Sequence, residues 1–332
     1  MSVAGRVARN ALLGFATLAA AIVFCGWYLV YGDRTHPQVP TEVIVPRGAA
    51  FDEIASELAR KGAIGNVWTF RALARLRGED VAVRAGEYRF AAHETQNDVL
   101  HALVAGGAQV ATWVTIPEGF TAAQIAQRLQ AAGVGSASAF LEAFMRDRVR
   151  VGGVWTKNLE GFLFPSTYLI PVEADPSEIE RLMTDEFRTQ LPASAAGDAR
   201  RLGVTVPQAV TVASLVEREA KVDADRPMIA AVIYNRLRAG MPLQVDATIE
   251  YALRAHKSDL SFADLRIDSP YNSYTHAGLP PTPIANPGLP SLEAALHPSK
   301  SSDLYYVYCG RGRHAFAKTL AEHQANVARC LQ

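Results

Sequence analysis

The sequence has few cysteines, no excess of either charge and none of the common zinc-binding spacings. Its 332 residues include three cysteines, and Lys plus Arg balance Asp plus Glu at 33 each. A basic excess is the usual mark of proteins that bind phosphate backbones, so nucleic acid is not expected as a partner. Without a CxxC or an HExxH pair the chain offers no recognisable metal cage, and we predict no metal and no other cofactor.

Motifs for nucleotide binding and for covalent catalysis are missing too. The chain has no GxxxxGK phosphate loop and no GxSxG nucleophile elbow, which argues against the commonest nucleotide-binding and serine-hydrolase sites. CGRGRHA (309–315) contains GxGxxA, but the residues that follow it, 316–332, are too few for the rest of a dinucleotide site. We interpret this segment as the turn of a hairpin.

A run without any charge, residues 11–31, lies near the N-terminus. About 20 apolar residues are needed for a helix to cross a bilayer, and Arg6 and Arg9 before the run favour a cytoplasmic N-terminus. We predict a transmembrane helix; the alternative is a cleaved signal peptide, although the run extends further than such peptides need. The rest of the chain is then exported, and there Cys309 and Cys330 can either pair or stay as thiols.

The rest of the chain has the composition of a folded protein. Hydrophobic residues make up 49% and charged residues 20%, which permits a sizeable core and, at this length, two domains. Residues 42–64 and 113–134 align at a constant offset, which matches Pro46 with Pro117 and Gly62 with Gly133. Each stretch is typical of a strand, a Pro-x-Gly turn, an amphipathic helix and a glycine that ends the helix. They indicate two small modules.

Further elements are predicted from periodicity and from glycine and proline positions. The first module gains a short strand at 86–90 and a helix at 95–106. Residues 139–191 are mostly helical, apart from an irregular strand pair at 159–170. Helices are predicted at 206–221 and 227–240, an ordered loop at 269–291, a strand at 303–309, and a last helix from Leu320. The fold class is therefore α+β.

ASLVEREA (213–220) ends an almost wholly apolar helical run. At about 100° per residue, Glu217 lies on the stripe of Val206 and Val210, whereas Arg218 and Glu219 face away from it and can reach water or counter-charges. Burial disfavours the charged form of a carboxylate, so Glu217 is a candidate proton donor. The alternative is an ordinary helix ion pair with Lys221.

A buried acid beside an aromatic and amide-rich loop suits polysaccharide cleavage. The acid protonates the glycosidic oxygen, and aromatic faces hold sugar rings. Ordinary glycosidases add a second carboxylate. By residue type the candidates are Asp223, Asp225, Asp246 and Glu250.

The sequence resembles the endolytic murein transglycosylase family, also called MltG or YceG-like. The resemblance rests on ASLVEREA and on three blocks downstream of it: VIYNRLRAGMPLQVDATIEYAL (232–253), YNSYTHAGLPPTPIANPGLPSLEAALHP (271–298) and HAFAKTLAEHQANV (314–327). LEGFLFPSTY (159–168) and the N-terminal apolar run fit the same family. Val245, Ala247 and Thr282 depart from its usual pattern, which affects loop detail and not the acid.

The resemblance implies a membrane anchor, a small LysM-like module and a catalytic domain with a lysozyme-like helix. The expected organisation is a cytoplasmic tail (1–10), a transmembrane helix (11–31), a linker (32–40), a LysM-like glycan-contacting module (41–109) and a catalytic domain (110–332). The expected location is the inner (cytoplasmic) membrane, with the catalytic domain periplasmic or extracellular. Peptidoglycan strands, the membrane and peptidoglycan polymerases are the implied partners.

The resemblance also implies a reaction, with Glu217 matching the catalytic glutamate of the family. The expected reaction cleaves the β-1,4 bond between N-acetylmuramic acid and N-acetylglucosamine within nascent strands, leaves a 1,6-anhydromuramoyl end and terminates elongation. The muramoyl C6 hydroxyl is the nucleophile, which explains why no partner carboxylate is evident.

We predict that five residues line the glycan cleft: Gln244, Asp246, Tyr271, Asn272 and Tyr274. The alternative for each is a turn-stabilising role in a proline-rich loop. Two other functions stay open. One is a non-catalytic, membrane-anchored scaffold that binds peptidoglycan; the other is an anchored amide or peptide hydrolase, which the absence of a recognisable nucleophile disfavours.

Overall fold

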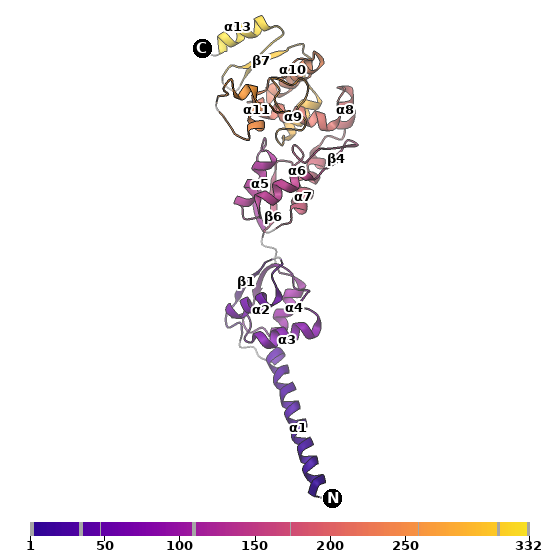
Figure 1. The fold of residues 1–332 in the computed structure, drawn as a ribbon, viewed down its shortest axis with the longest axis vertical. Helices are drawn as coiled ribbons and strands as arrows, with labels where there is room; N and C mark the ends of the chain where they lie inside the picture. Colours follow the sequence, from indigo (N-terminus) through magenta and orange to yellow (C-terminus); the bar gives the residue numbers. More distant parts are fainter. Residues whose placement is uncertain are drawn as a thin grey trace. The chain divides into compact units, whose positions relative to one another are not determined.

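The computed structural model describes residues 3–32, 36–46, 48–107, 111–172, 174–257, 259–310 and 313–330, without the side chains of residues 3–12 and Leu29. The chain divides into two compact units (Figure 1). One comprises Met1–Ala111 with Pro171–Glu173, and the other comprises Thr112–Ile170 with Ala174–Gln332. The boundary between the two units follows Ala111. The sequence predicts the start of the catalytic domain at residue 110.

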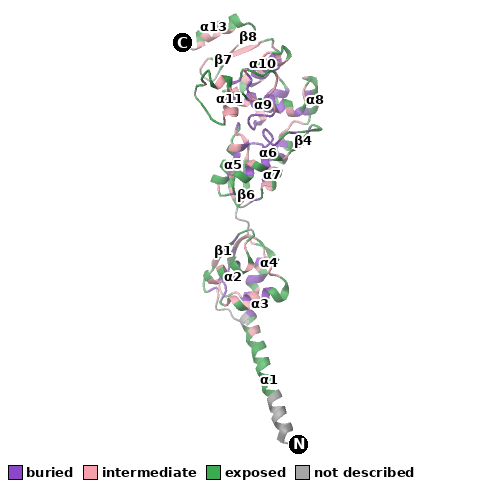
Figure 2. Cartoon of the chain, viewed as in Figure 1, coloured by how far each residue is buried: buried purple, intermediate pink, exposed green. Residues whose placement is uncertain are grey.

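The chain starts with a helix, α1 (Val3–Trp27), which continues into a π-helical turn, η1 (Tyr28–Gly32). Its described side chains are mostly exposed, among them Phe15, Leu18 and Phe24 (Figure 2). In the described part of the chain, no helix is long and apolar enough to cross a membrane. The predicted span, 11–31, overlaps α1 and η1, but residues 11, 12 and 29 and the predicted tail 1–10 lie outside the described side chains. The transmembrane helix stays a prediction.

The remainder of the first unit is a small α+β module. Strands β1 (Thr41–Val45) and β2 (Gly86–Phe90) pair antiparallel, from Thr41 opposite Phe90 to Val45 opposite Gly86. Alternation along β1 turns Val43 and Val45 inward, where they join a core built from the helices. The helices are α2 (Phe51–Arg60), α3 (Val67–Arg77) and α4 (Gln96–Ala105). β2 and α4 confirm the predicted strand and helix.

Helix α3 was not predicted. Its start carries an N-cap signal, because the Asn66 side chain accepts hydrogen bonds from the N–H groups of Trp68 and Thr69. Its inward positions, Phe70, Leu73 and Ala74, have the i, i+3, i+4 spacing of one helix face and are buried. Both signals are present in the sequence.

The two repeated stretches end their helices in the same way. α2 and α5 (Ala122–Ala131) are each followed by a glycine with a φ of 76°, Gly62 or Gly133. In both, the glycine N–H and the next N–H bond back to the last turn, which is the Schellman motif. The bonds run from Gly62 to Ala59, Ala63 to Leu58, Gly133 to Gln130 and Val134 to Leu129. The predicted order of strand, turn, helix and glycine is confirmed in both repeats.

The second unit combines short two-stranded sheets with helices. Among the described residues the sheets are β3 (Ala111–Thr115) with β6 (Thr167–Pro171), β4 (Arg150–Val151) with β5 (Val154–Trp155), and β7 (Tyr305–Tyr308) with β8 (His314–Ala317). The helices are α5, α6 (Ala137–Arg146), α7 (Pro176–Gln190), α8 (Ala195–Arg201), α9 (Val206–Glu219), α10 (Arg226–Arg238), α11 (Asp246–Leu253), α12 (Leu289–Leu296) and α13 (Leu320–Cys330), with 3-10 turns η2 (Asp223–Asp225) and η3 (Asp264–Arg266). This mixture confirms the α+β class.

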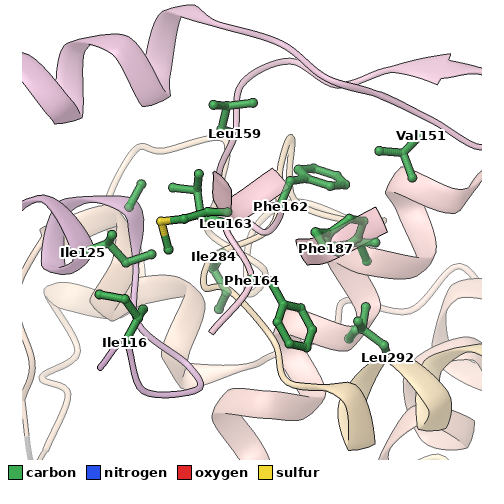
Figure 3. Packing of buried hydrophobic residues seen from close by; sticks show 14 of the residues in the cluster. Ile116, Ile125, Val151, Leu159, Phe162, Leu163, Phe164, Phe187, Ile284 and Leu292 are labelled. Carbon is green, nitrogen blue, oxygen red and sulfur yellow. The ribbon is translucent and has the colours of Figure 1, made fainter. Parts of the chain in front are cut away.

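The predicted strand pair at 159–170 is wrong. Residues 159–163 form turns and bends, and only β6 is a strand. β6 pairs with β3, beside which the Ile116 N–H donates to the Ser166 carbonyl at 2.9 Å. Phe162 and Phe164 lie in the core (Figure 3), where Phe162 meets Phe187 edge-on at 5.2 Å between ring centroids. The aromatic residues that suggested a second strand instead fill the core.

The C-terminal prediction is confirmed. β7 and β8 form an antiparallel hairpin, from Tyr305 opposite Ala317 to Tyr308 opposite His314, and α13 follows it. A disulfide joins Cys309, at the hairpin turn, to Cys330, at the end of α13. The crosslink therefore fixes the last helix to the hairpin, whereas Cys25 is free and exposed.

Removal of this disulfide should destabilise the second unit. We expect Cys330→Ser to lower its free energy of unfolding by about 2–4 kcal/mol, because the crosslink restricts the unfolded chain over a separation of 21 residues. Thermal unfolding of the full chain, oxidised and reduced, measures the effect. Cys25→Ser is the matched control and should leave the midpoint unchanged. Equal midpoints for oxidised wild type and Cys330→Ser would contradict the prediction.

Candidate active site

Helix α9 is a core helix that ends in charged residues. Thr205 caps its start in a capping box with Gln208, in which each side chain accepts from the N–H of the other residue. Every residue from Ala209 to Val216 is buried, so the helix buries all of its faces and not only the predicted stripe. The charged residues Glu217, Arg218 and Glu219 form its last turn.

The Glu217 carboxyl is buried at the end of α9. Its side chain is 6% exposed. One oxygen lies 3.2 Å from the Arg226 guanidinium, and the other accepts a hydrogen bond from the Gly288 N–H at 3.0 Å. The predicted burial is confirmed, but the ion-pair partner is Arg226 of α10 and not Lys221.

Arg226 is itself held from three sides. Its side chain is 10% exposed, its Nε donates to Asp223 at 3.0 Å, and its Nη1 donates to the Ser291 hydroxyl of α12. The guanidinium thus joins α9, η2, α10 and α12 at one point. Such a fixed cation also fixes the carboxylate that it faces.

Three of the five predicted cleft residues meet in one cavity of about 430 Å³ beside the end of α9. Gln244 and Asp246 enter it from the start of α11, and Tyr274 comes from the 269–291 loop and donates to Asp246. Glu219, Arg236 and Tyr306 line the same cavity. Its wall carries hydroxyl, amide, carboxylate and guanidinium groups and aromatic rings, a set that suits a sugar chain.

Glu219 faces away from the stripe that carries Glu217, where the helix angle predicted access to water or to counter-charges. Its carboxyl lies in this cavity and accepts a hydrogen bond from the Tyr306 hydroxyl at 3.1 Å. Burial raises the pKa of Glu219 to about 7, and the charge of Asp246 adds to the increase. The hairpin that carries Tyr306 covers this side of α9. The angular position of a residue on one helix does not predict which other element packs there.

Tyr271 lies in a different cavity, of about 560 Å³. Its ring meets that of Tyr251 at 4.9 Å, and its hydroxyl bonds to Thr282 at 2.8 Å. Arg218 and Glu250 line this cavity and form an ion pair at 3.1 Å. Arg218 therefore finds a counter-charge, as predicted, and it borders both cavities.

Asn272 is fully buried. Its amide donates to the carbonyls of Leu265 and Ile267 at 3.1 and 2.9 Å, and its carbonyl accepts from the Tyr274 N–H at 2.9 Å. These contacts favour the turn-stabilising alternative for Asn272 over a direct contact with glycan.

Glu160 and Asn286 form a second buried polar cluster. Glu160 accepts from the Ala122 N–H at the start of α5, from Asn286 and from the Tyr251 hydroxyl, at 2.9 to 3.1 Å. Asn286 also accepts from the N–H groups of Gly161 and Leu163 and donates to the Phe120 carbonyl. Burial raises the pKa of Glu160 to about 7. The cluster fixes the loop before α12, which carries Gly288.

The sequence blocks that surround this site match a known family model. The model is that of the YceG-like family, and it matches residues 43–329. This chain belongs to the YceG-like family.

Known members resemble this YceG-like protein over most of its length. A protein of Bacillus subtilis (strain 168), named endolytic murein transglycosylase, is 34% identical over 84% of this chain and 81% of its own. Two Streptococcus pneumoniae proteins of the same name are 32% identical over 86% of this chain, which spans 57% of their length. A 2.6 Å crystal structure of a YceG-like protein from Listeria monocytogenes superposes with a TM-score of 0.58 at 30% identity, covering 87% of this chain and 99% of that one.

Sequence reasoning missed several polar partners in this YceG-like protein. Arg226 could have been identified from the sequence. It stands at the start of a helix that is otherwise rich in apolar residues, and a buried arginine needs a charged or polar partner. Ser291 and Glu160 carried no such signal, because their partners lie far away in the sequence. They are found only when the elements are packed together.

The stability of the second unit should fall as the pH rises from about 4.5 to about 7. In the folded state the pKa values of Glu160 and Glu219 are raised from 4.5 to about 7. The folded protein therefore binds these two protons more tightly than the unfolded chain does. Their contribution to the free energy of unfolding is complete below pH 4.5 and is lost as the pH rises through the folded-state pKa values. Denaturant unfolding at pH 5 and pH 8 measures the fall. Glu160→Gln should reduce it, and the exposed Glu293→Gln should not; equal falls in all three proteins would contradict the assignment.

Proposed function

We propose that this protein is a peptidoglycan lytic transglycosylase that cleaves glycan strands internally. The observation that carries the proposal is the Glu217 carboxyl, 6% exposed, held by Arg226 and the Gly288 N–H at the end of a core helix. The position of the residue within ASLVEREA and the names of the relatives in Bacillus subtilis and Streptococcus pneumoniae support it. A buried carboxyl beside sugar-sized cavities is suited to acid catalysis on a polysaccharide.

The reaction proposed here uses Glu217 as acid and then as base. Glu217 gives its proton to the glycosidic oxygen between N-acetylmuramic acid and N-acetylglucosamine, and the bond from the muramoyl C1 to that oxygen breaks. The muramoyl C6 hydroxyl oxygen bonds to C1 and returns its proton to Glu217. One strand then ends in 1,6-anhydromuramic acid and the other in a free hydroxyl. No water is consumed, and Glu217 recovers its proton.

Two cavities adjoin the last turn of α9, and in this proposal the glycan strand occupies them. Gln244, Asp246 and Tyr274 line one of them and Tyr271 the other, and Arg218 borders both. In this proposal the first three residues bind glycan by hydrogen bonds and ring contacts. Asn272 acts indirectly, since it holds the backbone of Tyr274.

Membrane attachment is part of the same proposal. Apolar side chains of α1, among them Phe15, Ile22 and Phe24, are exposed, and burial of such side chains in lipid is favourable. The Cys309–Cys330 disulfide is typical of an exported, oxidising compartment. We propose that α1 anchors the chain in the cytoplasmic membrane and that both units lie outside it. The first unit, a LysM-like module in this view, contacts glycan, and termination of strands beside peptidoglycan polymerases is the expected role.

Loss of the acid should abolish cleavage. We expect Glu217→Gln to reduce strand cleavage by at least about 100-fold, the contribution of one positioned acid. Full-length protein in detergent is incubated with purified peptidoglycan strands, and the products are analysed by mass spectrometry. Wild type and the control Glu293→Gln should give internal products one water lighter than those of hydrolysis. Strands that bind but stay uncut with wild type would make the protein a scaffold, and equal cleavage by Glu217→Gln would exclude this acid.

Membrane attachment should depend on the N-terminal helix. We expect the full chain to stay in the membrane fraction after alkaline carbonate extraction, because its apolar segment is buried in lipid. A chain that starts at residue 32 is the matched control and should be released. Release of both chains would contradict the anchor.

A further inference from the structure

The Pro-x-Gly turn of the second repeat lies against the end of α9. It joins β3 to α5 and contains Glu118 between Pro117 and Gly119. A Cβ built on Gly119 would lie 3.6 Å from Cγ of Glu217, which is an ordinary contact distance. The Gly119 N–H also donates to the Asn286 carbonyl at 2.9 Å, so the turn is tied to the loop that leads to α12. The backbone of the turn that carries Glu118 is thus fixed beside Glu217.

Gly288 brings the two carboxyl groups together. Its N–H donates to Glu217, and the space beside its Cα is filled by Glu118. A Cβ at this position would overlap the Oε1 and Cδ atoms of Glu118. The φ of Gly288 is −77°, which any residue adopts. A side chain at this position would therefore have to displace the Glu118 carboxyl, although the backbone conformation would accept it.

Arg226 presents a difficulty for an acid catalyst. Its guanidinium carries a positive charge 3.2 Å from a Glu217 oxygen, whereas the proposed reaction begins with a Glu217 that has no negative charge to pair with it. A further negative charge near the carboxyl would oppose the effect of Arg226. Asp223 offsets part of the Arg226 charge from η2, but it does not contact Gly288 in the way that Glu118 does.

The electrostatics of Glu118 agree with this arrangement. Partial burial raises the pKa of Glu118, and the negative charge of Glu217 raises it further, against the opposing effect of Arg226. Repulsion between two carboxylates acts on both members, so two such groups share protons as a pair. The charged groups that act on Glu118 are Glu217 of α9, Asp223 of η2 and Arg226 of α10.

We propose that Glu118 is a positioning residue for the Glu217 acid: its negative charge offsets Arg226, so that the carboxyl pair holds the proton that Glu217 delivers. This inference rests on the proposed function. Glu118 is then a second carboxylate at the site, which the sequence alone did not identify. Its role is electrostatic, and it is not a nucleophile. In the first repeat the equivalent residue is Arg47, so the acidic turn belongs to the second repeat alone.

The test is the pH dependence of strand cleavage by the full chain in detergent, from pH 5 to pH 9. Glu118→Gln should move the alkaline limb of the profile to lower pH by about one unit, because only Asp223 then offsets the charge of Arg226 beside Glu217. Cleavage at alkaline pH should fall about tenfold, and cleavage at pH 5 should change little. Glu118→Asp keeps the charge and should keep most of the wild-type profile. Glu142→Gln, which removes an exposed carboxylate from α6, is the control.

A second variant tests the geometry with both carboxylates present. Gly288→Ala keeps the N–H that bonds to Glu217, but its methyl group must displace Glu118. We expect the alkaline limb to move in the same direction as in Glu118→Gln. An unshifted limb in Glu118→Gln overturns the inference, and so does an equal loss of rate at every pH, which indicates a structural role. Absence of cleavage by wild type at all pH values would instead refute the proposed function.

Discussion

The ion pair of Glu217 with Arg226 is the interaction around which the centre of the second unit is built. Loss of one partner from a buried pair typically costs about 3–5 kcal/mol, because the remaining charge is left uncompensated. Here the pair is completed by Asp223, by the Ser291 hydroxyl and by the Gly288 N–H. These groups come from η2, α12 and the residue just before α12. The requirement to satisfy one buried charge thus fixes how α9, α10 and α12 meet.

The Glu160 and Asn286 cluster has a similar effect on the other side of the site. It holds the start of α5 through the Ala122 N–H and holds the loop before α12 through the Asn286 side chain. The turn that carries Glu118 and the loop that carries Gly288 are therefore attached to the same cluster. A buried polar network that is fully bonded defines one arrangement of its elements.

The last turn of α9 places one charged side chain in the buried ion pair and two in the cavities beside it. Glu217 points into the ion pair, Glu219 into the cavity that Tyr306 and Tyr274 line, and Arg218 borders both cavities. Tyr306 belongs to a hairpin whose turn is crosslinked to α13 by the disulfide. The C-terminal elements, far from ASLVEREA in the sequence, thereby complete the wall of the cavity that Glu219 enters. The fold brings these groups together at the end of one buried helix.

Local pattern in the sequence by itself determined the repeats, the glycines that end α2 and α5, the long loop, the C-terminal hairpin and the burial of Glu217. Each depends on residues within a few positions of one another, since helix period, capping and positive φ are local properties. The tertiary structure alone decided that Arg226 and not Lys221 pairs with Glu217, that β6 pairs with β3, that Asn272 supports a turn and that Glu118 approaches Gly288. The physical reason is that a buried charge or amide bonds to whatever group the packing brings within about 3 Å. That group can come from any part of the chain.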